Sequence, residues 1–242
     1  MRVLLLGGTV DARQLADAFT AAGFEVVESV AGRTRQARGG AASRVGGFGG
    51  VDGLARYLRA ARVTAVVDAT HPFAAQITSN AAEACALTGI PLLRFNRPGW
   101  RTHPDASRWI WVADHGQAAV AAARMGGRVL LTVGRQSLLA YRELTDVVAR
   151  VAEWQGDPVP AGWHVIESRG PFTLAGELDL LRRAQVAVLV SKNSGGAPTS
   201  AKLDAARELG LPVIMVDRPP TPDGVGEVSS TADAVAWLVD QH

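Results

Sequence analysis

The feature that most constrains the fold is a short apolar segment that ends in an acid and leads into a polar turn. Ala65-Val-Val-Asp is apolar at successive positions, as is typical of a strand buried on both faces of a parallel sheet. Ala69-Thr-His-Pro-Phe interrupts it, and Pro72 has the fixed φ and missing N–H of a first helical position. The alanine-rich residues 73–88 predict a helix. In open α/β sheets, a turn in this place binds ligands.

The same alternation of strand, loop and helix recurs along the chain. Further strands are predicted at residues 2–6, 24–30, within 44–48, 90–95, 109–112, 128–133, 147–152, 164–167, 186–190 and 212–216, and helices at 11–22, 51–61, 114–125, 173–183, 197–209 and 231–239. Pro98, Gly99 and Pro104 interrupt the pattern before it restarts. We therefore predict an α/β fold of two Rossmann-like parallel-sheet domains with a cleft between them, at residues 1–100 and 101–242.

Composition excludes several classes of protein. With 48% hydrophobic residues the chain is expected to be globular, and no apolar run approaches the roughly 20 residues that span a bilayer. The N-terminal apolar run lacks a cleavage site and predicts a first strand, not a signal peptide. Cys85 is the single cysteine, so disulfides within the chain are excluded and a cytoplasmic protein is expected. We interpret Cys85 as a buried, inert thiol.

Charge argues for a small anionic ligand. The net charge of +2 argues against a nucleic-acid or membrane partner, and no His, Cys, Asp and Glu grouping has metal-ligand spacing. Only two of the 25 Lys and Arg residues are lysines, a bias that a GC-rich genome explains in large part. Arginines in predicted turns nevertheless suit carboxylate or phosphate groups, which the guanidinium binds with two hydrogen bonds. They are Arg33, Arg35, Arg94, Arg97, Arg101, Arg135, Arg169 and Arg218.

The first strand, turn and helix form a candidate nucleotide site. Gly7-Gly8-Thr9 joins them, although the full G-x-G-x-x-G pattern is absent and a turn without a ligand would look the same. An NAD site carries an acid near the end of the second strand, where this chain has Arg33, Thr34 and Arg35. These residues favour a 2′-phosphate and hence NADP(H) over NAD(H), the alternative being a solvated basic loop.

Other enzyme classes lack their motifs. Neither the Gly-x-Ser-x-Gly elbow nor the Gly-x-x-x-x-Gly-Lys-Ser/Thr loop occurs, and Ser191-Lys192 lacks the partners that serine–lysine hydrolases need. A carbonyl reductase would normally carry Tyr-x-x-x-Lys, but neither Tyr57 nor Tyr141 has a lysine four residues on. A methyltransferase would need an acid at the end of the second strand. A cofactor-plus-substrate enzyme therefore fits best.

An ordered set of motifs covering nearly the whole chain resembles the precorrin-6A reductase family of cobalamin biosynthesis, including its cobalt-precorrin-6A reductases. The motifs are Leu6-Gly7-Gly8-Thr9, Leu15-Ala16, Ala31-Gly32-Arg33-Thr34, Arg44-Val45-Gly46-Gly47-Phe48-Gly49, Asp68-Ala69-Thr70-His71-Pro72-Phe73-Ala74, Leu93-Arg94, Arg97-Pro98-Gly99-Trp100, Arg169-Gly170-Pro171-Phe172, Ser191-Lys192-Asn193-Ser194-Gly195-Gly196 with Lys202, and Arg218-Pro219. Val10-Asp11-Ala12 departs from the family, which more often has a glutamate–alanine pair there.

The resemblance implies an NADPH-dependent oxidoreductase that reduces one C=C bond of the ring-contracted tetrapyrrole precorrin-6A to give precorrin-6B. Residues 1–100 would bind the cofactor, with the glycine turn on the pyrophosphate, Arg33 to Arg35 on the 2′-phosphate and Ala69 to Phe73 at the nicotinamide. The implied cofactor residues are Gly7, Gly8, Thr9, Ala31, Gly32, Arg33, Thr34, Arg35, Ala69, Thr70, Pro72 and Phe73.

The same resemblance implies that residues 101–242 contribute to a site for a flat macrocycle fringed with carboxylates. The implied substrate residues are Arg94, Arg97, Trp100, Arg135, Arg169, Ser191, Asn193, Ser194, Gly195, Gly196 and Lys202. His71 and Lys192 are candidate catalytic proton donors, and water or the substrate's own carboxyl groups are the alternatives. For each arginine, the alternative to binding a substrate carboxylate is a salt bridge at the protein surface.

Three functions stay open at this point. The substrate is either cobalt-free precorrin-6A or its cobalt-containing counterpart of the anaerobic route, and a regulator that senses NADP without chemistry is the third reading. Other enzymes of the cobalamin pathway are conceivable partners through product transfer.

Overall fold

The computed structural model describes residues 1–31, 43–156, 158–196 and 199–241, which form two compact units. Unit 1 comprises Met1–Pro98 and Pro219–His242, and unit 2 comprises Gly99–Arg218. Each unit contains a six-stranded sheet in which every pairing is parallel, so the predicted α/β class with two parallel-sheet domains is confirmed.

The sheet of unit 1 has the strand order β12-β5-β4-β1-β2-β3. This is the Rossmann order, which reverses between β1 and β4. Its strands are β1 (Arg2–Leu6), β2 (Glu25–Val30), β3 (Ser43–Val45), β4 (Ala65–Asp68), β5 (Leu92–Phe95) and β12 (Gly226–Val228).

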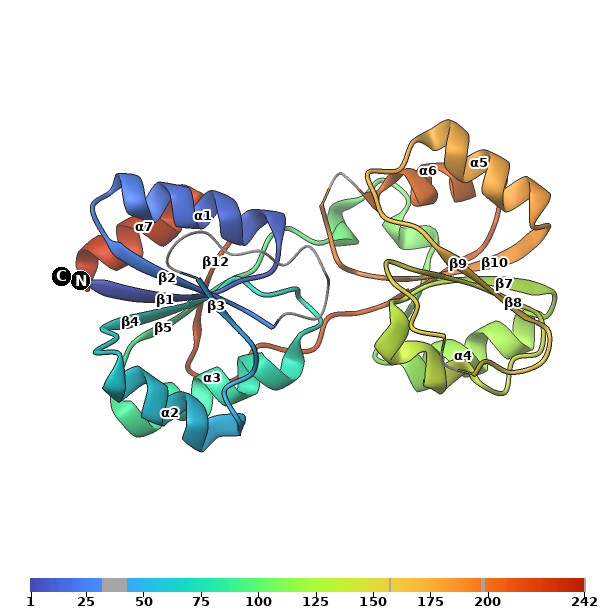
Figure 1. Cartoon of the computed structure of the whole chain (residues 1–242). Coiled ribbons are helices and arrows are strands. Elements are labelled where there is room, and N and C mark those ends of the chain that lie inside the picture. The colour runs from blue at the N-terminus through green and yellow to red at the C-terminus, as the bar shows by residue number, and fades with distance from the viewer. Residues whose placement is uncertain (32–42, 157, 197–198, 242) are drawn as a thin grey trace. The chain divides into compact units, whose positions relative to one another are not determined.

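Helices cover both faces of this sheet, because successive side chains of a strand point to opposite sides. Its helices are α1 (Val10–Ala21), α2 (Gly50–Ala60), α3 (Ala75–Thr88) and α7 (Thr231–Asp240). Val3 and Leu5 of β1 belong to one apolar core with α1 and α7, while Leu4 and Leu6 belong to a second core with α2 and α3 (Figure 1). The β1 segment is therefore apolar at every position from Val3 to Leu6.

The C-terminal segment belongs to unit 1, whereas the boundary predicted at residue 100 placed it in the second domain. β12 pairs with β5 as the sixth strand, and Ala234 and Leu238 of α7 fill the core beside α1. The physical reason is that β12 and α7 cover β5 and the apolar surface on the α1 side of the sheet. A three-residue strand at 226–228 leaves too short an apolar pattern to be predicted.

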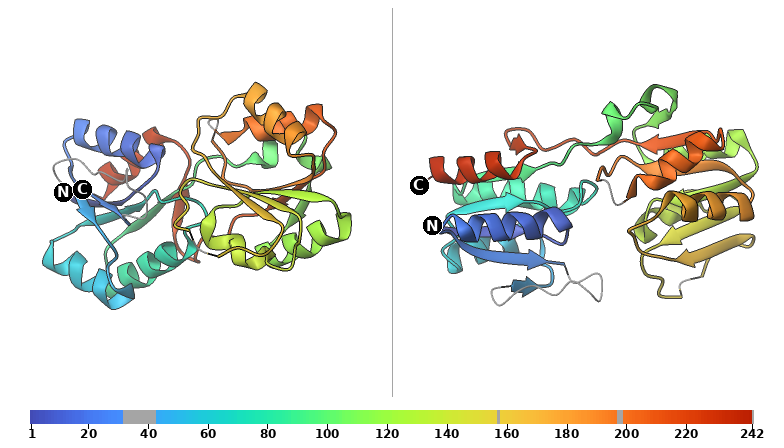
Figure 2. Two further views of the ribbon diagram at one scale, coloured as in Figure 1. Left: turned by 45° about the vertical axis from the view of Figure 1, so that its right-hand side comes forward. Right: turned by 90° about the horizontal axis from the view of Figure 1, so that it is seen from above.

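The sheet of unit 2 has the order β6-β11-β10-β7-β8-β9 and reverses between β7 and β10. Its strands are β6 (Ile110–Val112), β7 (Arg128–Thr132), β8 (Val147–Val151), β9 (Trp163–Glu167), β10 (Val186–Lys192) and β11 (Val213–Val216). Its helices are α4 (His115–Met125), α5 (Leu174–Arg183) and α6 (Ala201–Glu208), with 3-10 turns η1 (Trp100–Thr102), η2 (Ala106–Arg108) and η3 (Arg135–Tyr141). Figure 2 (left) shows α5 and α6 on one face and α4 on the other.

Two differences from the predicted elements concern the candidate site. Helix α3 begins at Ala75, not at residue 73, because a turn closed by the Ala74 N–H···O=C His71 bond (2.8 Å) comes first. Strand β10 extends to Lys192, not to Val190, since Ser191 and Lys192 stay paired with β7 or β11. Ser191 is thus a buried strand residue, 1% exposed, and the loop begins at Asn193.

Membrane-spanning helices and clusters of possible metal ligands are both absent from the described residues. None of the helices there is both long and apolar enough to span a membrane. No three or more His, Cys, Asp and Glu residues come together there as possible metal ligands. Cys85 is buried in α3, and burial raises the pKa of its thiol to about 12, as expected of an inert cysteine.

Candidate active site

The turns after β1 and β4 meet at the point where the strand order of unit 1 reverses. Leu6 and Asp68 end these strands in register, and the Ala69 N–H donates to the Leu6 carbonyl at 2.9 Å. Thr9 joins the two turns: its Oγ1 donates to the Ala69 carbonyl at 2.9 Å and accepts from the Ala12 N–H at 3.0 Å. The hydroxyl thereby caps α1 and fixes the spacing of the two turns.

The glycine turn needs its glycines. Gly8 has φ +102°, a left-handed conformation that side chains disfavour. A Cβ on Gly7 would lie 2.7 Å from Oε1 of Glu28. The backbone therefore passes close to β2 and leads directly into the N-terminus of α1, where unpaired N–H groups and the helix dipole favour an anion. A turn of this kind can hold a phosphate group.

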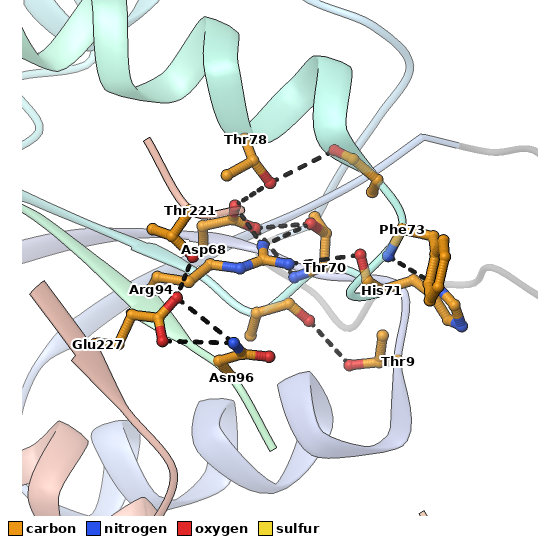
Figure 3. A network of polar contacts seen from close by, with 12 residues as sticks. Thr9, Asp68, Thr70, His71, Phe73, Thr78, Arg94, Asn96, Thr221 and Glu227 are labelled. Carbon is orange, nitrogen blue, oxygen red and sulfur yellow. Dashed lines mark hydrogen bonds and ion pairs between the residues drawn. The ribbon is translucent and has the colours of Figure 1, made fainter. Parts of the chain in front are cut away.

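A buried ion pair underlies the turn of residues 69–73 (Figure 3). Asp68 accepts from Thr70 through its N–H (3.0 Å) and Oγ1 (2.7 Å), and from Thr78 Oγ1 at 2.7 Å. Arg94 pairs with Asp68 and donates to Thr70 Oγ1 at 3.0 Å and to the His71 carbonyl at 3.4 Å. Arg94 is 3% exposed, so its guanidinium is directed into the protein rather than toward a ligand.

The orientation of His71 follows from the same turn. The Phe73 N–H donates to Nδ1 of His71 at 3.2 Å, and the two rings lie 5.9 Å apart. Because Nδ1 accepts this bond, the neutral imidazole carries its proton on Nε2. Pro72 is buried, and His71 and Phe73 on either side of it in the chain are half-buried.

The predicted 2′-phosphate residues cannot be compared with the structure. Ala31 follows β2 and is exposed, while Gly32, Arg33, Thr34 and Arg35 lie outside the described residues. The choice of NADP(H) over NAD(H) therefore stays a prediction from sequence.

In unit 2, the polar residues again gather where the strand order reverses. Thr132 of β7 pairs in register with Ser191 of β10, and Lys192 ends β10. A Cβ on Gly134 would lie 3.6 Å from Lys192 Nζ, which places the ammonium beside the turn that precedes Arg135. Burial lowers the pKa of Lys192 to about 8.

Lys202 is buried near this position. Its Nζ donates to the Thr199 carbonyl at 2.5 Å and lies 4.8 Å from the centroid of the Trp100 ring. Burial lowers the pKa of Lys202 to about 7, assisted by the charges of Arg150 and Lys192 and opposed by Glu177. Trp100 is 7% exposed and belongs to the apolar core, so its ring packs inward.

Asn193 has a structural role that its motif did not reveal. Its Oδ1 accepts from the Trp100 N–H at 2.7 Å and its Nδ2 donates to Asp217 Oδ1 at 3.0 Å. The side chain is buried, and a Cβ on Gly99 would lie 2.6 Å from Oδ1. Asn193 therefore orders the loop of Ser194, Gly195 and Gly196 and does not offer its side-chain amide to a ligand.

Two of the remaining arginines form ion pairs within their own unit. Arg97 pairs with Asp11 at 2.5 Å, and Arg169 pairs with Glu153 at 2.8 Å and donates to the Ala152 carbonyl. Arg135 lies at the start of η3, directly after the Gly134 turn. Their predicted contacts with substrate carboxylates remain untested.

Sequence reasoning missed a histidine–tyrosine pair in unit 2. His115 Nδ1 lies 2.8 Å from the Tyr141 hydroxyl, and the rings form an edge contact. Burial and the charge of Lys192 lower the pKa of His115 to about 4, against the effect of Asp114. Burial also raises the pKa of Tyr141. Asp114 marked His115 as the first residue of a helix, but no sequence signal linked it to Tyr141.

Comparison with known proteins settles the family. The sequence matches the family described as "Precorrin-6x reductase CbiJ/CobK" over residues 2–239. The chain belongs to the precorrin-6x reductase family. Members of this family are oxidoreductases that act on a CH–CH group, as the resemblance implied.

Individual relatives match over almost their full length. A precorrin-6A reductase of Rhodococcus erythropolis is 46% identical over 98% of this chain and 97% of its own. A cobalt-precorrin-6A reductase of Priestia megaterium is 34% identical over 99% and 98%. The solved structure titled "CobK precorrin-6A reductase" superposes with a TM-score of 0.88 at 40% identity, covering 100% of this chain and 97% of that one. The precorrin-6x reductase fold is therefore shared throughout.

Proposed function

We propose that this chain reduces one C=C bond of precorrin-6A with NADPH as the hydride source, giving precorrin-6B in cobalamin biosynthesis. The observation that carries the proposal is the full-length similarity to precorrin-6A reductases, at 46% and 42% identity for two of them. Three cobalt-precorrin-6A reductases are 31% to 34% identical, which favours the cobalt-free substrate.

The geometry of unit 1 supports a dinucleotide. Gly7, Gly8 and Thr9 would hold the pyrophosphate at the N-terminus of α1, and Ala69, Thr70, Pro72 and Phe73 would line the nicotinamide. Arg33 and Arg35 would bind the 2′-phosphate. When bound, the nicotinamide supplies the hydride. The protein's own task is then to orient the two reactants, to exclude water and to deliver one proton.

Cationic groups of unit 2 suit the carboxylate fringe of the tetrapyrrole. Arg135, Arg169 and Lys192 would bind carboxylates, the backbone of residues 194–196 would add N–H donors, and the buried Lys202 would contribute its positive charge from inside the unit. Arg97 of unit 1 would bind a carboxylate once its ion pair with Asp11 is broken. We assign ordering roles to Arg94, Ser191, Asn193 and Trp100, because these four side chains are buried within their units.

Two side chains can deliver the proton. Lys192 Nζ, with a pKa of about 8, is mostly protonated at neutral pH and still acidic enough to donate. His71 can donate from Nε2 only as the imidazolium, in which Nδ1 also carries a proton, so the hydrogen bond from the Phe73 N–H to Nδ1 must first be broken. Lys192 is our first choice, since the proton it loses is returned by solvent without rearranging the turn.

The decisive experiment is anaerobic incubation of the enzyme with precorrin-6A and NADPH, followed at the absorbance bands of the cofactor and the macrocycle. We expect one NADPH consumed per macrocycle reduced. Parallel reactions with NADH and with cobalt-precorrin-6A establish the preferences. A protein that binds NADPH but oxidises none of it with either tetrapyrrole would instead be a sensor.

A further inference from the structure

The ion pair of Asp68 and Arg94 is part of the sheet itself. The two residues lie opposite each other on the neighbouring strands β4 and β5. Their side chains are 1% and 4% exposed, so neither charge is solvated by bulk water. Charges this deeply buried are retained only when hydrogen bonds compensate for the lost hydration.

The hydrogen bonds of the pair run to the candidate cofactor turn and to the start of α3 (Figure 3). Oδ1 of Asp68 holds the N–H and hydroxyl of Thr70, and Oδ2 holds the hydroxyl of Thr78. Arg94 holds the Thr70 hydroxyl and the His71 carbonyl. The pair thus anchors both sides of the turn to the rigid centre of the sheet.

Thr9 supplies a third anchor from the other turn. Its hydroxyl binds the Ala69 carbonyl at 2.9 Å, so residues 69, 70 and 71 are each held through backbone atoms. A turn fixed in this way loses little conformational entropy when a ligand binds, because it is already ordered.

We infer that Asp68 and Arg94 are positioning residues that hold the turn of Ala69 to Phe73 in the conformation that binds the cofactor. They act through Thr70 and the backbone of His71 and touch neither reactant. The inference rests on the proposed function. It replaces the expectation, drawn from the family resemblance, that Arg94 binds a substrate carboxylate.

The principal variant is Arg94→Lys, which keeps the charge but cannot make all the guanidinium's bonds at once. We expect the dissociation constant for NADPH to rise about tenfold, the lower end of the effect of lost orienting groups. The KM for precorrin-6A at saturating NADPH should stay unchanged. A raised KM for precorrin-6A with an unchanged dissociation constant for NADPH would make Arg94 a substrate ligand and overturn the inference.

A second variant protects the test against misfolding. Thr78→Val keeps the side-chain shape and removes one donor to Asp68, so the affinity for NADPH should fall in the same direction by a smaller factor. Arg94→Met leaves Asp68 as an unpaired buried charge and should lower stability; adding Asp68→Asn should restore the stability but not the NADPH affinity. Restored affinity in the double variant would also contradict a positioning role.

Two controls separate positioning from general destabilisation. Leu238→Ala removes a fully buried side chain from the same unit and should lower Tm without changing NADPH affinity. Arg128→Lys makes the same substitution in the ion pair with Asp146 of unit 2 and should change neither constant. If the wild-type protein binds no NADPH, the proposed function fails and this inference with it. If wild type and Arg94→Lys bind NADPH equally, only the inference fails.

Discussion

At the scale of single residues, the two lysines of the chain lie in environments that disfavour their charged form. Each is held at a pKa well below the ordinary value of 10.5, to about 8 for Lys192 and about 7 for Lys202, with burial as the largest cause. A charged lysine in such a place costs stability, which functional sites tolerate.

Lys192→Met should change the pH dependence of turnover. If Nζ delivers the proton, kcat of the wild type falls as the pH rises through about 8, because the donor is then deprotonated. The variant should lose this limb and most of its turnover. Steady-state rates between pH 6 and pH 10 measure it, with His71→Ala as the comparison. A His71→Ala enzyme that keeps most of its turnover removes the histidine from the acid role.

Lys202→Met should stabilise the protein while weakening substrate binding. The folded pKa of about 7 lies below the unfolded value of 10.5, so the unfolded chain binds more protons between these pH values. The free energy of unfolding of the wild type therefore rises with pH between about 7 and 10.5. The destabilisation by the buried charge of Lys202 is complete below about pH 7. We expect the variant to gain about 2 kcal/mol at pH 6 and progressively less toward pH 10. Urea unfolding at several pH values tests this.

At the scale of elements, N-cap residues fix the turns that precede the helices. Thr9 and Thr173 cap α1 and α5 in the same way, each accepting from the N–H three residues on. Thr9 also donates a hydrogen bond to a second turn, at the Ala69 carbonyl. The pair therefore offers a natural comparison between a cap that only stabilises a helix and a cap that also orders a site.

Thr9→Val should cost about 2 kcal/mol of stability, from one lost cap and one lost hydrogen bond, and should also weaken NADPH binding. Thr9→Ser should retain both properties. Urea denaturation and an NADPH titration measure the two effects. In Thr173→Val we expect a loss of about 1 kcal/mol with unchanged NADPH affinity. Equal affinities in the two valine variants would count against the ordering role of Thr9.

At the scale of the whole molecule, the chain leaves unit 1 after Pro98 and returns to it at Pro219. Unit 1 is thus completed only when the last segment of the chain has been made. Trp237 is the only one of the six tryptophans outside Gly99–Arg218, so tryptophan fluorescence reports mainly on unit 2.

Leu238→Ala should destabilise unit 1 selectively. Leu238 is fully buried beside Phe19 and Leu93, and the cavity left by its loss should cost about 3 kcal/mol. We expect the far-ultraviolet circular dichroism transition to begin at a lower temperature, while the fluorescence transition shifts less. Coincident shifts of both transitions would show instead that the two units unfold together.

Local patterns were sufficient for most of the fold. Fully apolar segments such as residues 65–68 predicted buried parallel strands, and Asp114 marked the start of a helix, because these signals act between neighbours in sequence. Local patterns did not predict β12, and they did not predict that residues 219–242 belong to unit 1. That choice depends on which apolar face lacks a cover, and this is a property of the assembled sheet.

The candidate site divides in the same way. Chain order and apolar runs were enough to predict that glycine and polar turns follow β1, β4 and β10. The role of each side chain there depends on contacts between segments that are distant in sequence. These contacts turn Arg94 of β5 and Asn193 inward as partners of Asp68 and Asp217, and they bring His115 to Tyr141. A polar or charged residue near the end of a strand has the same local signature whether it faces a ligand or a buried carboxylate. The difference is the charge across the sheet, which lies many residues away along the chain.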